Sequence, residues 1–561
     1  MKTKATIAIL FFTAVILYAP LIGWGVPRAD APDRTKTFAT DEILPLEGLA
    51  EMHNTFVISK PDRNYGYPWW HYFVVSAAQA PYLIYARLTG NLGSPSPVYP
   101  FGFRDPVAGL RWLSLIGRFV SVLMGASIVV AAFLFARNLW DYSVGLVAAI
   151  LTLFNYLMVY YSRTGNLDVP VTCWTSIGLA IYSVILTKGF TVRRGVWLGV
   201  FTALAISTKE QAALVFLPLG AALLWQGMYP KTGEARTWRP HLAALGVSLG
   251  VYLVATGMLV DPQRNIHHVN TMLFHPSSLS SMGFYRPGYP RTWSGTVTMY
   301  LDFFQGLSWT SSLPVVLLAL AGAWATLRSD PRRLILLVPV ATLFVGLVLP
   351  MRTLPLRYFL PLVIILCGFA AYGIFQVTRR RFRWALVPLI TLACGWELSV
   401  AADLSYAQYR ETRLMTAEWI GAHARSGDRI EYFGVREVMP PLPANIPTRR
   451  IAGRTEWKKE SGHGPRILQY LAAEGPEFVF IAPDVTAKPG VPYSGDCPPE
   501  VYDALMKGAT NYTQVAYFPT PAILPAWFRR PRLDYPTVAP PVRLFARKDI
   551  VSRVSGRTAQ P

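Results

Sequence analysis

The sequence is short of charged residues and of cysteine. Only 15% of its 561 residues are Asp, Glu, Lys or Arg, whereas soluble domains carry about 25%, so an ordinary soluble globular protein is excluded. Its four cysteines show no C-x-x-C spacing, and all but one lie in apolar segments. A disulfide framework and a cysteine-ligated metal site are therefore excluded.

Long apolar runs dominate what is present. The chain is 52% hydrophobic, its mean hydropathy is +0.31, and many runs are about as long as a bilayer is thick. The composition predicts a polytopic α-helical membrane protein with about 11 transmembrane helices. We expect these spans near 5–24, 112–135, 143–161, 170–187, 195–207, 211–227, 242–260, 311–327, 333–350, 358–377 and 384–402.

The net charge of +21 is distributed as the positive-inside rule expects, because Lys and Arg cluster in alternate short gaps between the spans. This pattern argues against nucleic acid as the partner. It places the amino terminus in the cytoplasm and the carboxyl-terminal tail outside. The first apolar run ends without a clean cleavage signal, which favours a retained anchor. We expect a multi-pass protein of a bacterial inner membrane, with its active site outside the cytoplasm.

The composition changes near residue 403. We expect a transmembrane domain over 1–402, with a first outer loop at 25–111, and an extracytoplasmic α/β domain over 403–561. Helices are predicted at Thr416–Ala424 and Pro465–Ala473, and strands at Arg429–Phe433, Glu477–Ile481, Tyr512–Phe518 and Val542–Ala546.

Carboxylates and cations gather on the predicted outer face. Asp41 and Glu42 follow the first span, Asp168 and Lys209 lie in two short turns, and Arg352 and Arg357 precede the tenth span. Carboxylates act as general bases or hold a metal, and cations bind phosphate. A membrane enzyme that uses a lipid phosphate needs both kinds of group near the headgroups.

Each residue also has a purely structural reading. Thr40-Asp41-Glu42 could start a helix, and Asp168 could simply pair with Arg163. Lys209 could belong to a polar turn, and Arg357-Tyr358 could be an interfacial anchor. The sequence alone leaves these alternatives open.

Several motifs together resemble the glycosyltransferase C superfamily, in the glycosyltransferase family 39 branch of protein O-mannosyltransferases and the lipid A aminoarabinose transferase. The resemblance covers roughly residues 1–400. The motifs that carry it are Asp41-Glu42, Tyr67-Pro68-Trp69-Trp70-His71, Ser162–Pro170, Ser207-Thr208-Lys209-Glu210 and Leu356–Pro361.

The resemblance implies transfer of a sugar, with mannose one candidate, from a polyprenyl-phosphate donor to a hydroxyl or amine of a protein, lipid or glycan. It implies Asp41 as the general base, with support from Asp168. Glu42 would orient the site or help to hold a metal. We expect Lys209, Arg357 and Arg352 on the donor phosphate, and a single displacement that inverts the anomeric centre. Sugar or acceptor contacts are expected from Trp69, Trp70, His71 and Tyr358.

Three matters stay open at this stage. Many relatives have a Pro-Pro-Leu type sequence where this chain has Pro68-Trp69-Trp70, so the acceptor is not identified. No cofactor is certain, and a divalent metal, Mg or Mn, is an alternative; His267, His268 and His275 fit no familiar metal spacing. The rival function is a transporter or flippase, whose signature would be ionisable residues within spans and paired broken helices.

Overall fold

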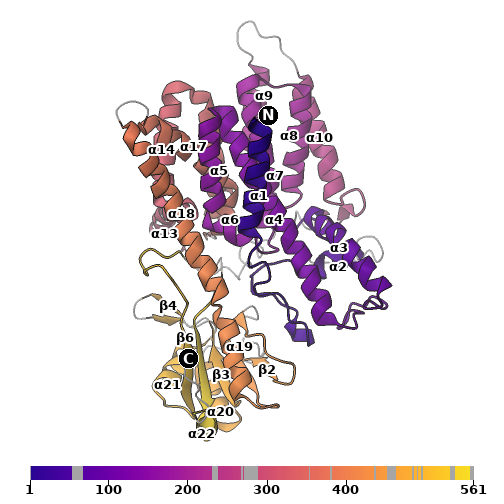
Figure 1. The fold of residues 1–561 in the computed structure, drawn as a ribbon, viewed down its shortest axis with the longest axis vertical. Coiled ribbons are helices and arrows are strands. Elements are labelled where there is room, and N and C mark those ends of the chain that lie inside the picture. The colour runs from indigo at the N-terminus through magenta and orange to yellow at the C-terminus, as the bar shows by residue number, and fades with distance from the viewer. Residues whose placement is uncertain are drawn as a thin grey trace. The chain divides into compact units, whose positions relative to one another are not determined.

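The structure is a computed structural model (Figure 1). The histidines at 267, 268 and 275 lie outside the residues that it describes. It describes residues 2–53, 67–229, 238–263, 265–266, 270, 289–352, 354, 356–378, 382–434, 438–451, 463–482, 485–488, 491–493, 497–530 and 537–555.

The chain forms two compact units, each assembled from segments that are distant in the sequence. The first, which is helical, comprises Met1–Ile22, Asp41–Tyr85 and Trp112–Ala402. The second comprises Gly23–Thr40, Ala86–Arg111 and Asp403–Pro561. The predicted division into a transmembrane domain, 1–402, and an extracytoplasmic domain, 403–561, stays a prediction.

Helices make up most of the described chain. They are α1 (Lys2–Tyr18), α2 (Glu47–His53), α3 (Trp70–Leu88), α4 (Pro106–Leu139), α5 (Tyr142–Phe154), α6 (Tyr156–Tyr161), α7 (Asp168–Lys188), α8 (Val192–Ile206), α9 (Ala213–Met228), α10 (Arg239–Ala255), α13 (Trp293–Ser311), α14 (Leu313–Ser329), α15 (Val338–Leu343), α16 (Leu349–Met351), α17 (Val363–Thr378), α18 (Leu386–Tyr409), α19 (Thr412–His423), α20 (His463–Ala473), α21 (Pro499–Met506) and α22 (Val551–Ser555), with short 3₁₀ turns that include η3 (Glu210–Ala212), η4 (Pro331–Leu337), η6 (Leu356–Leu362) and η7 (Arg383–Ala385).

Six helical segments of the described chain are long and apolar enough to cross a membrane, and α13 with α14, bent by 103°, would add a seventh if they form one span. The chain is therefore an integral, multi-pass membrane protein, whereas the finer count of eleven spans stays a prediction. The expected span at 143–161 is interrupted at Asn155, whose side chain accepts a hydrogen bond from the Met158 amide and begins α6. The six segments are Pro106–Leu139, Asp168–Lys188, Glu210–Met228, Pro331–Val348, Leu356–Thr378 and Arg383–His423.

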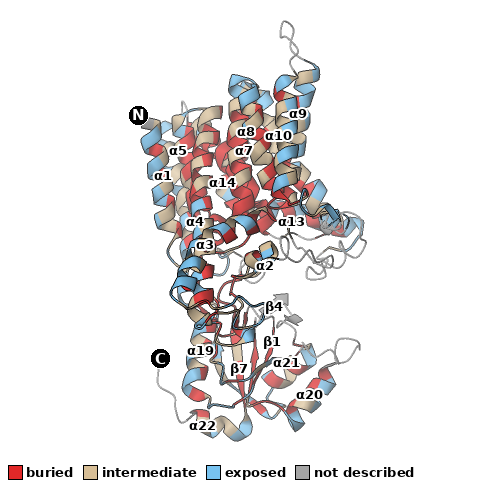
Figure 2. Cartoon of the chain, turned by 90° about the vertical axis from the view of Figure 1, so that its right-hand side faces the viewer, coloured by how far each residue is buried: buried red, intermediate tan, exposed pale blue. Residues whose placement is uncertain are grey.

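Burial separates inner helices from outer ones in the first unit (Figure 2). The apolar stretch that contains α17 is 94% buried, whereas α1 exposes Ile9, Phe12 and Ile16. Glycine allows some inner helices to approach closely: a Cβ on Gly322 of α14 would lie only 1.9 Å from the Phe369 carbonyl oxygen of α17. Small residues at helix contacts are typical of packing in membranes, where close backbone approach replaces the hydrophobic effect.

The second unit is built on a five-stranded sheet in the order β2-β1-β3-β7-β6. The strands β1, β2 and β3 are parallel, and β7 is antiparallel to both β3 and β6. A separate pair, β4 and β5, is antiparallel. The bounds are β1 (Ile430–Phe433), β2 (Thr448–Arg450), β3 (Phe478–Ile481), β4 (Val485–Lys488), β5 (Val491–Tyr493), β6 (Tyr512–Phe518) and β7 (Val542–Arg547).

Alternate residues of the central strands point into two different cores. On β3, Phe478 and Phe480 pack with Ile420 of α19, whereas Val479 and Ile481 pack with Ile467 of α20. This alternation follows from the two-residue period of a strand and makes a helix–sheet–helix sandwich. The four strands and two helices predicted here are confirmed to within about four residues at their ends. Their extracytoplasmic location stays a prediction.

Residues 23–40 join this second unit through buried polar contacts. The Trp24 indole donates to Glu411 at 2.8 Å, and the Arg413 guanidinium lies 3.9 Å from the centre of the Phe38 ring. Glu411 and Arg413 are themselves paired at 2.8 Å and fully buried. The segment that precedes Asp41 is therefore anchored on the fold of the second unit.

Candidate active site

Asp41 lies in a turn rather than in a helix. Its φ of 58° is in the left-handed region, which costs free energy for most L-residues but is tolerated by Asp and Asn. The next helix, α2, begins only at Glu47, so the helix-start alternative is wrong. The Asp41 side chain is 39% exposed, which leaves its carboxylate accessible.

Glu42, its neighbour, is buried and tightly bound. Both of its oxygens accept from Arg118 of α4, at 2.6 and 2.7 Å, and one also accepts from the Gly165 amide at 2.7 Å. The Arg118 side chain is completely buried and also donates to the Ile22 carbonyl at 2.7 Å. This network fastens the loop after α1 to α4 and to the turn before α7.

Asp41 forms an ion pair with a residue more than 300 positions away in the chain. Its carboxylate lies 2.7 Å from the Arg357 guanidinium, which comes from η6 and has only 2% of its side chain exposed. The interfacial-anchor reading of Arg357-Tyr358 is therefore wrong, because both side chains are buried inside the first unit.

Asp168 forms a second pair, with Lys209 at 2.8 Å. Asp168 is the first residue of α7, where the helix dipole favours a carboxylate. Lys209 precedes η3 and is buried, so it is more than part of a polar surface turn. Arg163 donates instead to the Leu17 and Tyr18 carbonyls.

The Tyr358 ring joins the two pairs. The Lys209 ammonium lies 4.8 Å from its centre and the Arg357 guanidinium 5.4 Å, and Lys209 also lies 5.6 Å from the Tyr67 ring. Asp41, Asp168, Lys209 and Arg357 thus converge from four segments. We call these four residues the acid–base cluster.

The electrostatics of the cluster keep Lys209 charged. Burial lowers the pKa of Lys209, but Asp168, Tyr67 and Tyr358 raise it, and the net shift is upward. Burial also raises the pKa of Tyr67, although Lys209 and Arg357 oppose this. The site therefore holds a protonated lysine and a neutral phenol at physiological pH.

The other predicted residues lie apart from these contacts. Among described residues, Arg352 donates to Thr296 at 2.9 Å and to the Tyr289 and Pro290 carbonyls. Trp69 and Trp70 both stack on Phe73. His71 is 1% exposed, and burial lowers its pKa to about 3, so the imidazole is neutral. Whether these residues contact a sugar or phosphate stays a prediction.

Sequence reasoning missed two residues. Arg118 lies within the span expected at 112–135, and only the fold reveals its pairing with Glu42. Tyr67 belongs to the motif Tyr67-Pro68-Trp69-Trp70-His71, and the structure places its ring beside Lys209. A basic residue inside an apolar span was the available signal for Arg118, because such a charge needs a partner.

The donor set does not fit a metal site. Within the described ranges, no three His, Cys, Asp or Glu side chains are close enough to hold an ion together. Glu42 already binds Arg118 and the Gly165 amide, and Asp168 is paired with Lys209.

In a comparison with known protein families, residues 114–256 match the model of the dolichyl-phosphate-mannose-protein mannosyltransferases. The chain resembles the glycosyltransferase C superfamily. The matched range contains Arg118, Asp168 and Lys209, whereas Asp41 and Arg357 lie outside it. A comparison with curated proteins gives no match.

Solved membrane-enzyme structures align along nearly all of the chain. ArnT from Cupriavidus metallidurans in the apo state is 14% identical, with a TM-score of 0.49, over 98% of this chain and 99% of that one. The same enzyme bound to undecaprenyl phosphate is 13% identical, with a TM-score of 0.48, over 99% of each chain. The apo oligosaccharyltransferase of Archaeoglobus fulgidus is 10% identical, with a TM-score of 0.45, over 96% of this chain and 88% of that one.

Proposed function

We propose that the protein is an inverting glycosyltransferase that moves a sugar from a polyprenyl-phosphate donor to an acceptor hydroxyl or amine. The observation that carries the proposal is the acid–base cluster, in which an accessible carboxylate lies beside two buried cations. The family match supports the donor class, because that family is described by its dolichyl-phosphate-mannose donor.

In this proposal Asp41 is the general base. Its carboxylate is accessible and lies 2.7 Å from the Arg357 guanidinium. The acceptor loses its proton to Asp41 as its oxygen or nitrogen attacks the anomeric carbon. A single displacement then inverts the configuration at that carbon.

Lys209 and Arg357 are proposed to bind the donor phosphate and stabilise the charge of the leaving group. Both cations lie near the Tyr358 ring, at 4.8 and 5.4 Å from its centre. In this proposal one phosphate contacts both of them. Asp168 positions Lys209 through their 2.8 Å contact. Arg352 would add a third cation only if it leaves its present partners near α13.

The finer assignments are proposals as well. We propose that the reaction takes place on the outer face of a bacterial inner membrane, in a protein of eleven spans with an extracytoplasmic α/β domain. The family match favours mannose as the sugar. The acceptor, whether protein, lipid or glycan, is not assigned.

Incubation of the purified protein with a polyprenyl phosphate carrying a radiolabelled sugar tests the proposal. Transfer to an acceptor, or hydrolysis of the lipid-linked sugar, would support a glycosyltransferase. The rival transporter or flippase would move the labelled lipid across a vesicle membrane without cleaving the sugar–phosphate bond. Movement without cleavage under conditions that support binding would therefore contradict the proposal.

A further inference from the structure

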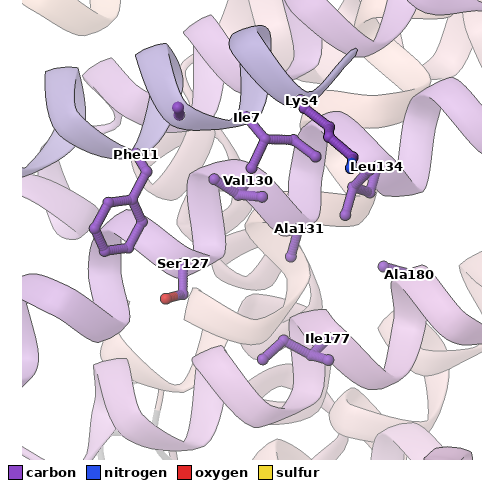
Figure 3. Close-up of a pocket in the computed structure, with 10 residues that line it drawn as sticks. Lys4, Ile7, Phe11, Ser127, Val130, Ala131, Leu134, Ile177 and Ala180 are labelled. Carbon is purple, nitrogen blue, oxygen red and sulfur yellow. The ribbon is translucent and has the colours of Figure 1, made fainter. Parts of the chain in front are cut away.

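Two cavities of the first unit lie away from the acid–base cluster. One, of about 350 Å³, lies between α1, α4 and α7 and is almost wholly apolar (Figure 3). Its one cation among the described lining residues is Lys4, which is exposed. An apolar cavity of this kind offers little to distinguish one membrane lipid from another.

The second cavity has a different chemistry. It encloses about 570 Å³ where α4 ends and where η4, α17 and η7 meet. Two arginines, Arg333 and Arg383, line it together with Gln376. The Trp140 and Tyr372 rings, stacked with their centres 4.7 Å apart, form an apolar wall. Cations beside an apolar wall match a ligand that is anionic at one end and apolar at the other.

The described lining of this cavity has two arginines and one acid. The acid, Asp141, accepts hydrogen bonds from the Ser143 and Val144 amides and so caps α5. Arg333 contacts Asp330 through Nε at 3.1 Å. The cavity therefore keeps a net positive lining, and an anion there could accept paired N–H bonds.

The surroundings indicate that this cavity lies at the level of lipid headgroups. Beside Arg383, the side chains of Phe382, Trp384 and Val387 are 46%, 74% and 69% exposed. Exposed aromatic residues next to arginine are typical of the membrane–water interface. Basic pockets between transmembrane helices at this level bind anionic lipid headgroups.

We propose that this cavity binds an anionic glycerophospholipid, with its phosphate on Arg333 and Arg383 and its glycerol region against Gln376 and the Trp140–Tyr372 wall. The site is distinct from the acid–base cluster, so the lipid would be a bound partner rather than the sugar donor. Phosphatidylglycerol is the simplest probe of this chemistry.

Native mass spectrometry of the detergent-purified protein, with phosphatidylglycerol and phosphatidylcholine of identical acyl chains, tests the proposal. The wild type should retain one phosphatidylglycerol in preference to phosphatidylcholine. Because each cation near the headgroups favours an anionic lipid about fivefold, Arg333→Gln or Arg383→Gln should each reduce that preference about fivefold. The double variant should bind the two lipids nearly equally.

Matched controls separate a site from a diffuse positive surface. Arg332 is next in sequence, is 59% exposed and contacts Asp330, but it does not line the cavity, so Arg332→Gln should leave the preference within about twofold. Gln376→Trp narrows the cavity without changing its charge and should weaken retention. Unfolding temperatures of all variants show whether each remains folded.

Three outcomes would overturn the proposal. The first is a wild type that binds both lipids equally, and the second is an Arg332→Gln variant as impaired as Arg333→Gln. The third is displacement of the lipid by excess inorganic phosphate, which would indicate a site for a free anion instead.

Discussion

Adjacent carboxylates in one loop have opposite environments. Glu42 is buried, with both oxygens bound by Arg118 and a third bond from the Gly165 amide. Asp41 is 39% exposed, has a left-handed backbone and contacts Arg357 at 2.7 Å. The first environment holds its acid in place, whereas the second leaves a carboxylate able to meet a substrate.

The comparison shows that the two acids of an Asp-Glu pair need not share a task. A buried bidentate pair has a fixed geometry but is not accessible to a substrate. Removing either partner leaves the other charge buried without a counter-ion. In the Asp41 pair the carboxylate side is 39% exposed, whereas the Arg357 side is buried. We infer that Glu42 positions the loop and Asp41 performs the chemistry.

The largest expected effect is on turnover. Asp41→Asn keeps the shape and tolerates the left-handed backbone but cannot take the acceptor proton, so kcat should fall about 10²–10⁴-fold. Glu42→Gln should reduce the activity of the folded fraction less. Single-turnover assays with bound donor measure both. Equal losses of kcat in the two variants would contradict the different roles of Asp41 and Glu42.

Loss of Arg118 should mainly affect stability. Arg118→Met leaves Glu42 buried and unpaired and should lower the free energy of unfolding by about 3–5 kcal/mol. The double variant Arg118→Met/Glu42→Leu should recover most of this loss, because no charge remains unpaired. Chemical denaturation in detergent provides the measurement. If Arg118→Met is as stable as the wild type, the Arg118–Glu42 pair does not stabilise the loop.

The next effect is on the donor phosphate. Arg357→Ala and Lys209→Ala each remove a cation from the leaving group and should lower kcat about 10²–10³-fold. Arg357→Lys should rescue only partly, since a point charge replaces a planar fork. Steady-state kinetics with varied donor checks this. Unchanged donor kinetics in both alanine variants would remove these residues from the site.

The smallest effect is predicted at Gly165. A Cβ there would lie 3.0 Å from two atoms of the Glu42 side chain, so Gly165→Ala should destabilise the protein by about 1–3 kcal/mol through overpacking. Alanine at Gly23, where a Cβ would meet nothing within 4 Å, is the matched control. Thermal unfolding of the two variants should differ clearly, and equal stabilities would argue against a tight fit around Glu42.

The sequence was most informative where one feature repeats. Apolar runs predicted a helical membrane protein, and strand-like segments alternating with helices predicted the second unit, because both patterns extend over whole elements. It did not predict that residues 23–40 fold with the second unit, since Trp24 and Glu411 are 387 positions apart. It also gave no sign that the run at 143–161 breaks at Asn155.

For the site, sequence reasoning gathered Asp41, Asp168, Lys209 and Arg357 on one face without their pairing. The natural local partner of Asp168 was Arg163, five residues away, yet Lys209 takes that place. Pairings of this kind depend on how α7, η3 and η6 pack together, which no local pattern records. Burial likewise distinguishes Asp41 from Glu42, and it cannot be read from two adjacent acids.

The pH dependence of kcat at saturating donor tests the role of Asp41 most directly. In the wild type, the rate should fall towards low pH, because a general base acts only in its deprotonated form. The residual rate of Asp41→Asn should have lost this acid limb, while Glu42→Gln should keep it. An acid limb that persists unchanged in Asp41→Asn would contradict the assignment of Asp41 as the general base.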